Sequence, residues 1–107
     1  MNNEEIWKCV RFANEWLDRE SLPVQDPRIL RCFKIAEELG EVTAAIVGVT
    51  GQNPRKGVTH TWSEVQEELC DVILSAMVAL DCVSEEAQEV FEKHVQKRHD
   101  RTLGLIQ

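Results

Sequence analysis

Several kinds of signal are missing from this chain of 107 residues, and each absence excludes a class of protein. No run approaches the roughly 20 apolar residues that a membrane-spanning helix needs. No stretch alternates polar and apolar residues as a strand does. The four cysteines, Cys9, Cys32, Cys70 and Cys82, form no CxxC pair, which argues against zinc or dithiol redox motifs. Because they sit in apolar-patterned segments, we expect them to be reduced core residues.

Positive charge is also scarce. The chain has 12 Lys and Arg residues and 19 Asp and Glu residues, which gives a formal net charge of -7. This charge would repel a nucleic-acid polymer. The segment 1–5 carries acids where a signal peptide carries bases, so we expect a cytoplasmic protein with no membrane association. A small anionic substrate stays compatible with this charge if divalent metal ions bridge the two negative partners.

What is present is helical periodicity. Apolar residues recur every three or four positions, which predicts helices over residues 4–19, 26–51, 61–81 and 84–104. Asp26 before Pro27, the Thr61-to-Glu64 capping box and Ser84 mark helix starts, Gly48 and Gly51 offer a stop for the second helix, and Gly104 ends the fourth. The expected fold is all-α: one domain over residues 1–107, forming a compact antiparallel four-helix bundle. Its central pair would leave apolar surface exposed, so we expect self-association that completes the bundle.

Two acidic clusters lie on the two predicted central helices. The first reads EExxE over Glu37, Glu38 and Glu41, and the second reads ExxD over Glu68 and Asp71. Acids at this spacing share a helix face and repel one another unless a cation lies between them. Carboxylates favour Mg²⁺ or Mn²⁺, whereas a di-iron bundle would use Glu-x-x-His pairs, which are absent here. The alternative is a pair of solvated acidic faces.

The paired motif, the helix order and the chain length resemble those of the MazG-like all-α nucleoside triphosphate pyrophosphohydrolases. The resemblance covers nearly the whole chain and implies a bundle of that type that is completed by self-association into a homodimer or homotetramer. It implies magnesium-dependent cleavage of a (deoxy)nucleoside triphosphate to monophosphate and pyrophosphate by a metal-activated water, in nucleotide-pool housecleaning. Its metal ligands fall on Glu38, Glu41, Glu68 and Asp71. Helical spacing alone does not choose Glu38 over Glu37. Beside the catalytic Glu38, Glu37 is a candidate for a base or outer-sphere role, with a solvated glutamate as the alternative.

Substrate contacts are expected from three further places. In the loop 51–60, Arg55 and Lys56 suit phosphate oxygens and Asn53 suits phosphate, sugar or base, unless the loop is only a solvated turn. Near the C-terminus, Lys97 and Arg101 resemble the family's basic last helix, or else they interact with the helix end. Trp7 is a candidate for stacking on a base, with burial in the core as the alternative.

Two other functions stay open at this point. Phosphoribosyl-ATP pyrophosphohydrolysis is the enzymatic alternative, since related enzymes carry it out. A non-catalytic acidic helical interaction module is the other, and metal dependence distinguishes it from an enzyme.

Overall fold

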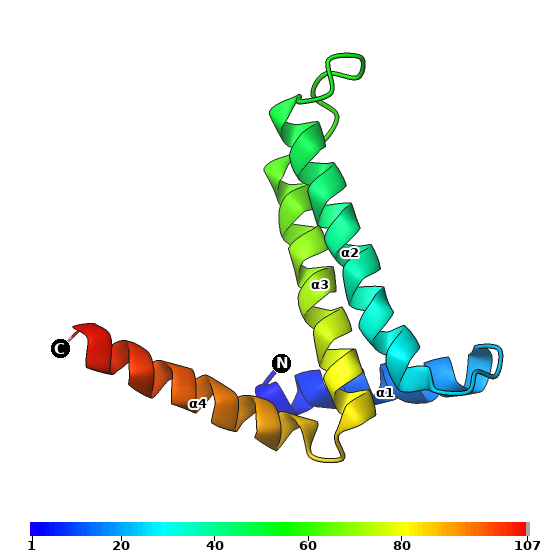
Figure 1. The fold of residues 1–107 in the computed structure, drawn as a ribbon, viewed down its shortest axis with the longest axis vertical. Helices are drawn as coiled ribbons and strands as arrows, with labels where there is room; N and C mark the ends of the chain where they lie inside the picture. Colours follow the sequence, from blue (N-terminus) through cyan, green and yellow to red (C-terminus); the bar gives the residue numbers. More distant parts are fainter. Residues whose placement is uncertain (107) are drawn as a thin grey trace.

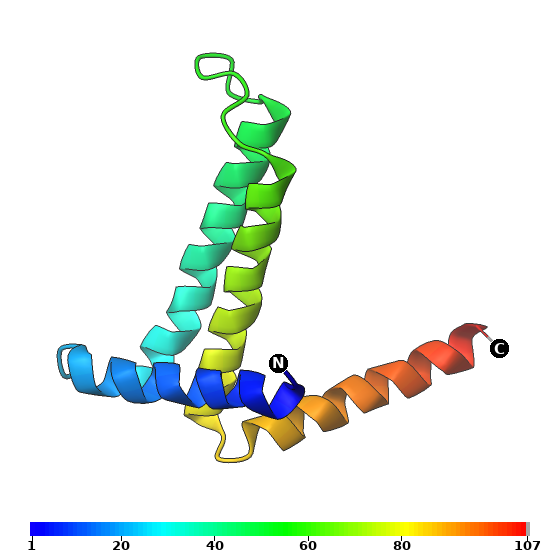
Figure 2. The same cartoon turned by 180° about the vertical axis from the view of Figure 1, so that it is seen from behind.

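The computed structural model describes residues 1–106, and within this range the chain contains four helices and no strand. They are α1 (Asn3–Glu20), α2 (Pro27–Thr50), α3 (Trp62–Val83) and α4 (Ala87–Ile106). Helices α2 and α3 run antiparallel as a long hairpin, α1 crosses its lower end, and α4 extends to one side (Figures 1 and 2). The expected all-α class is confirmed. No helix of the described residues is long and apolar enough to cross a membrane.

Local signals in the sequence set most helix ends. Asp26 caps α2 by accepting a hydrogen bond from the Arg28 amide, with Pro27 in the first turn. Gly51 ends α2 in the left-handed region, at a φ of 63° that other residues adopt at a cost. Thr61 and Glu64 form the expected reciprocal capping box at the start of α3.

The last helix departs from the prediction at both ends. It begins at Ala87, because Ser84 ends α3 and its hydroxyl accepts a hydrogen bond from the Glu86 amide in the intervening turn. It continues through Gly104 to Ile106, since one glycine in a helix costs only about 1 kcal/mol. The apolar stripe expected to bury this helix is also mostly exposed, and of its members only Ala87 is buried.

A small core lies where α1 meets the lower ends of α3 and α4. Trp7 is fully buried there with Val10 and Ala87, and its ring lies 5.9 Å from that of Phe91. The cysteines are not part of this core: Cys9, Cys32 and Cys70 are exposed and only Cys82 is partly buried, all as free thiols. Their expected burial is therefore wrong for three of the four.

A buried polar network fixes α1 against the hairpin. Arg31 of α2 is 8% exposed; it donates to the Asn14 side-chain oxygen at 2.9 Å and to Asp18 at 2.7 Å. Asn14 in turn donates to the Val78 carbonyl at 2.9 Å and to Asp81 at 2.8 Å, both on α3. Because buried polar groups need partners, this network specifies how the three helices meet.

The single chain does not form the compact bundle expected from the sequence. Its radius of gyration is 17.1 Å, whereas a compact domain of this length has about 13 Å. The reason is visible in Figure 1: α4 contacts α3 near its own start and then leads away from the hairpin. Apolar residues on α2, α3 and α4 are consequently left exposed, and the antiparallel arrangement is limited to the hairpin.

Candidate metal and phosphate site

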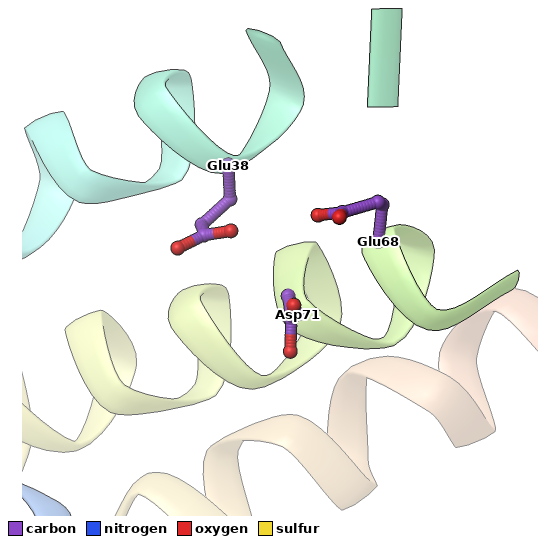
Figure 3. Close-up of side chains that lie close together, drawn as sticks. All are labelled: Glu38, Glu68 and Asp71. Carbon is purple, nitrogen blue, oxygen red and sulfur yellow. The ribbon is translucent and has the colours of Figure 1, made fainter. Parts of the chain in front are cut away.

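Three of the four predicted metal ligands come together on one side of the hairpin. Glu38 projects from α2 toward Glu68 of α3, with Asp71 one turn further along α3 (Figure 3). One carboxylate oxygen from each of these three residues lies within 4.8 Å of the others. Glu38 and Glu68 are half-buried and Asp71 is exposed, so the cluster lies at the surface of the helix pair. Helical spacing puts Glu68 and Asp71 on one face of α3, and the packing of α2 against α3 brings Glu38 to the same place.

The electrostatics show that the cluster is crowded with like charge. The pKa of Glu68 is raised, first by partial burial and then by the neighbouring carboxylates of Asp71, Glu41 and Glu38. Both causes disfavour the ionised form. A cation placed among these groups would relieve the repulsion.

The other acids of the first motif lie beside this group. Glu41 is exposed and outside the three-residue cluster, although its charge acts on Glu68. Lys34 makes ion pairs of 3.2 Å with both Glu37 and Glu38, and the pKa of the lysine is raised by Glu38 and then Glu37. Glu37 is therefore an outer neighbour of the cluster, and Lys34 keeps its positive charge beside it.

A groove of about 250 Å³ begins at the cluster and runs along the hairpin toward α1. Glu38 and Asp71 line it at one end, and Lys34 and Arg31 supply two cations, with Leu74, Ser75 and Val78 completing the walls. Carboxylates that can hold a metal thus share one groove with two groups that can bind anionic oxygens.

Arg31 is the member of this groove that the sequence analysis missed. A signal was present, because Arg31, Lys34 and Glu38 are spaced at i, i+3 and i+7 and so share one face of α2. Nothing in that spacing indicated that the arginine would be buried. Its burial comes from α1, whose Asn14 and Asp18 accept hydrogen bonds from the guanidinium.

The loop residues lie apart from the cluster. Thr50, where the loop begins, is roughly 18 Å along α2 from Glu38 at 1.5 Å per residue, and the loop extends beyond the end of the hairpin (Figure 1). Asn53 organises a local turn: its side chain accepts from the Arg55 amide, and its carbonyl accepts from the Lys56 amide. Arg55 and Lys56 are exposed. Within one chain, none of the three belongs to the groove.

The remaining candidates are also separate from the cluster. Trp7 is 0% exposed, so no base can stack on it while the chain keeps this arrangement. Lys97 and Arg101 are exposed on the outer half of α4, which leads away from the hairpin (Figure 2). Contact between these two residues and the groove would require a second chain or a movement of α4.

The donor set suits a hard divalent cation. Mg²⁺ takes oxygen ligands at 2.0–2.1 Å, so the ligands of one ion lie at most about 4.2 Å apart. The three carboxylates satisfy this after small side-chain rotations, since their oxygens already lie within 4.8 Å of one another. No cysteine or histidine belongs to the group, as expected of a site for Mg²⁺ or Mn²⁺ and not for a softer metal.

Comparison of the chain with protein-family models, with curated proteins and with solved structures finds no match. What the protein does is therefore inferred from the paired acidic motifs and from the geometry that the fold gives them.

Proposed function

We propose that this protein is a magnesium-dependent nucleoside triphosphate pyrophosphohydrolase, which cleaves a (deoxy)nucleoside triphosphate to the monophosphate and pyrophosphate. The observation that supports this most is the convergence of Glu38, Glu68 and Asp71 from two helices at the end of a groove that Lys34 and Arg31 also line. This combination of carboxylates and cations in one groove favours a metal-bridged phosphate ligand over a pair of solvated acidic faces.

The residues present divide into two roles. Glu38, Glu68 and Asp71 would hold Mg²⁺, and Glu41, whose charge acts on Glu68, is the fourth candidate ligand. When bound, the metal lowers the pKa of a water ligand and offsets negative charge on phosphoryl oxygens. Mn²⁺ would serve in the same way.

Lys34 and Arg31 would bind the phosphate oxygens that extend along the groove. Arg31 is held by Asn14 and Asp18, so its position is set before substrate arrives and little side-chain entropy is lost on binding. Lys34 would exchange its Glu37 and Glu38 partners for phosphate. That exchange frees Glu37, which is then available to accept a proton from the attacking water.

We also propose where this protein works and that it assembles with copies of itself. A protein that acts on free nucleotides would work in the cytoplasm, where those substrates are found, in the removal of unwanted triphosphates. Self-association into a homodimer or homotetramer would cover the apolar surface that the single chain exposes, and it is the route by which Lys97, Arg101 or the loop residues could reach an acidic cluster.

The test is to incubate the purified protein with Mg²⁺ and a panel of ribo- and deoxynucleoside triphosphates and to separate the products by chromatography. Monophosphate and pyrophosphate should form, and Glu38→Gln should abolish the reaction. Glu64→Gln, a matched change at the exposed capping glutamate of α3, should leave the rate unchanged. Turnover of phosphoribosyl-ATP alone would favour the alternative enzyme, and no Mg²⁺ binding at all would favour the interaction module.

A further inference from the structure

The side-chain amide of Asn14 has its orientation fixed by groups on α3. Its Nδ2 donates to the Val78 carbonyl at 2.9 Å and to the Asp81 carboxylate at 2.8 Å. A carbonyl and a carboxylate accept hydrogen bonds and do not donate them, so the NH₂ group faces α3 and the amide oxygen faces the other way. That oxygen accepts a hydrogen bond from Nε of Arg31 at 2.9 Å. Asp81 therefore helps to determine, through Asn14, what α1 presents to Arg31.

The same contacts select which edge of the Arg31 guanidinium stays free. A guanidinium carries its N–H groups in a rigid planar fork. Nε donates to Asn14 at 2.9 Å and Nη2 donates to Asp18 at 2.7 Å, which uses one edge of the plane. Nη1 and the second N–H of Nη2 are left for other acceptors, and Arg31 lines the groove that begins at the acidic cluster. Two adjacent donors in one plane match two oxygens of a phosphate group.

Asp81 is too far from the acidic cluster to act there itself. It lies ten residues after Asp71 on α3, which is about 15 Å at 1.5 Å per residue. Its half-buried side chain lines a separate hollow. The route from Asp81 to the groove is the pair of hydrogen bonds that runs through Asn14 to Arg31.

We propose that Asp81 is a positioning residue for the phosphate chain of the substrate, acting through Asn14 and Arg31. By holding the Asn14 amide with its oxygen toward α2, Asp81 fixes which edge of the guanidinium is free before substrate arrives. Less side-chain entropy is then lost on binding. This role rests on the proposed function, because it requires a phosphate-containing ligand in the groove.

Charge alone predicts the opposite effect of removing Asp81. Asp81→Ala takes a negative charge away from the neighbourhood of an anion-binding group, which would strengthen phosphate binding. Loss of positioning weakens binding instead, by on the order of tenfold, because a hydrogen bond to a charged group no longer orients the Asn14 amide. The direction of the change therefore separates the two explanations.

The test is isothermal titration calorimetry of the full chain with Mg²⁺ and inorganic tripolyphosphate, which requires no hydrolysis. Asp81→Ala should raise Kd about tenfold, and Asp81→Asn, whose amide oxygen can still accept from Asn14, should keep Kd within about twofold of wild type. Glu85→Ala removes the same charge from an exposed residue that lines the same hollow as Asp81, and it should leave Kd unchanged or slightly lower. Absence of binding by the wild type, or tighter or unchanged binding by Asp81→Ala, would overturn the proposal.

A double-mutant cycle shows whether Arg31 carries the effect. In the Arg31→Gln background, Asp81→Ala should change Kd by less than about twofold, because the group that it positions is absent. A full additional loss would mean that Asp81 acts elsewhere, which would overturn the proposal. If circular dichroism shows that Asp81→Ala does not fold, Asp81→Glu takes its place. The longer side chain keeps the charge but displaces the carboxylate from Asn14, so it should also weaken binding.

Kinetics separate this role from stability and from the proposed hydrolysis. With a deoxynucleoside triphosphate that is turned over, Asp81→Ala should raise KM and leave kcat within about twofold, because Arg31 binds phosphate in the ground state and in the transition state alike. A purely structural loss would lower kcat through a smaller folded fraction and leave KM unchanged, and that result would overturn the proposal. A wild type that binds tripolyphosphate but hydrolyses no triphosphate would refute the hydrolysis alone, since the calorimetric result for Asp81 does not depend on it.

Discussion

Removing the side chain of Asn14 should destabilise the protein far more than its small size suggests. Asn14→Ala deletes three hydrogen bonds at once: two that it donates to α3, at 2.8 and 2.9 Å, and one that it accepts from Arg31 at 2.9 Å. Two of them involve charged partners, Asp81 and Arg31, and Arg31 is buried. Each lost bond of this kind costs about 1–3 kcal/mol when a partner stays desolvated. Because water can enter and partly replace the lost partners, we expect the free energy of unfolding to fall by about 3–4 kcal/mol.

This loss is large against the total stability of about 5–15 kcal/mol that a domain has. Urea unfolding followed by circular dichroism measures it, at one fixed protein concentration because assembly contributes to stability. The matched control is Asn3→Ala, which removes an exposed hydrogen bond to Glu92 and should cost less than about 0.5 kcal/mol. Equal effects of the two substitutions would refute the view that the Arg31–Asn14 network fixes α1 to the hairpin.

Three other predictions follow from particular side chains. In the absence of metal, Glu68→Gln should raise the melting temperature, because it removes repulsion among carboxylates. It should also reduce the additional rise in melting temperature that Mg²⁺ causes. A Mg²⁺-dependent rise as large as that of the wild type would show that the metal binds elsewhere. Gly48→Ala should lower the melting temperature, because the added methyl group would collide with the His60 ring, whereas Gly40→Ala, with open space around it, should be neutral or stabilising. Burial raises the pKa of the Cys82 thiol, so fewer thiolates exist at a given pH and iodoacetamide should alkylate it more slowly than the exposed cysteines; equal rates would contradict this.

The sequence predicted local structure well wherever a chemical signal marks a helix end. The Asp26–Pro27 start, the Thr61–Glu64 capping box and the Gly51 stop all appear as expected, because each satisfies backbone groups within a few residues. The predicted start of α4 at Ser84 was wrong, because the Ser84 hydroxyl accepts a hydrogen bond from the Glu86 amide within a turn and does not cap a helix.

Tertiary arrangement was less predictable, since it depends on contacts between distant segments. Periodicity shows that α4 has an apolar stripe, but it does not show whether that stripe meets its own chain. The same limit applies to the site. Spacing within each helix predicted only that each acidic cluster shares one helix face, and the resemblance selected Glu38, Glu68 and Asp71, whose carboxylates lie close together. The burial of Arg31 and Trp7 depends instead on how α1 crosses the hairpin.

The most direct test of the proposed activity is phosphorus-31 nuclear magnetic resonance of the protein with Mg²⁺ and a mixture of the four deoxynucleoside triphosphates. Triphosphate signals should decline while monophosphate and pyrophosphate appear in equal amounts, and chelation of the metal should stop the reaction. Release of orthophosphate with a nucleoside diphosphate, or unchanged triphosphate signals in the presence of Mg²⁺, would contradict the proposed activity.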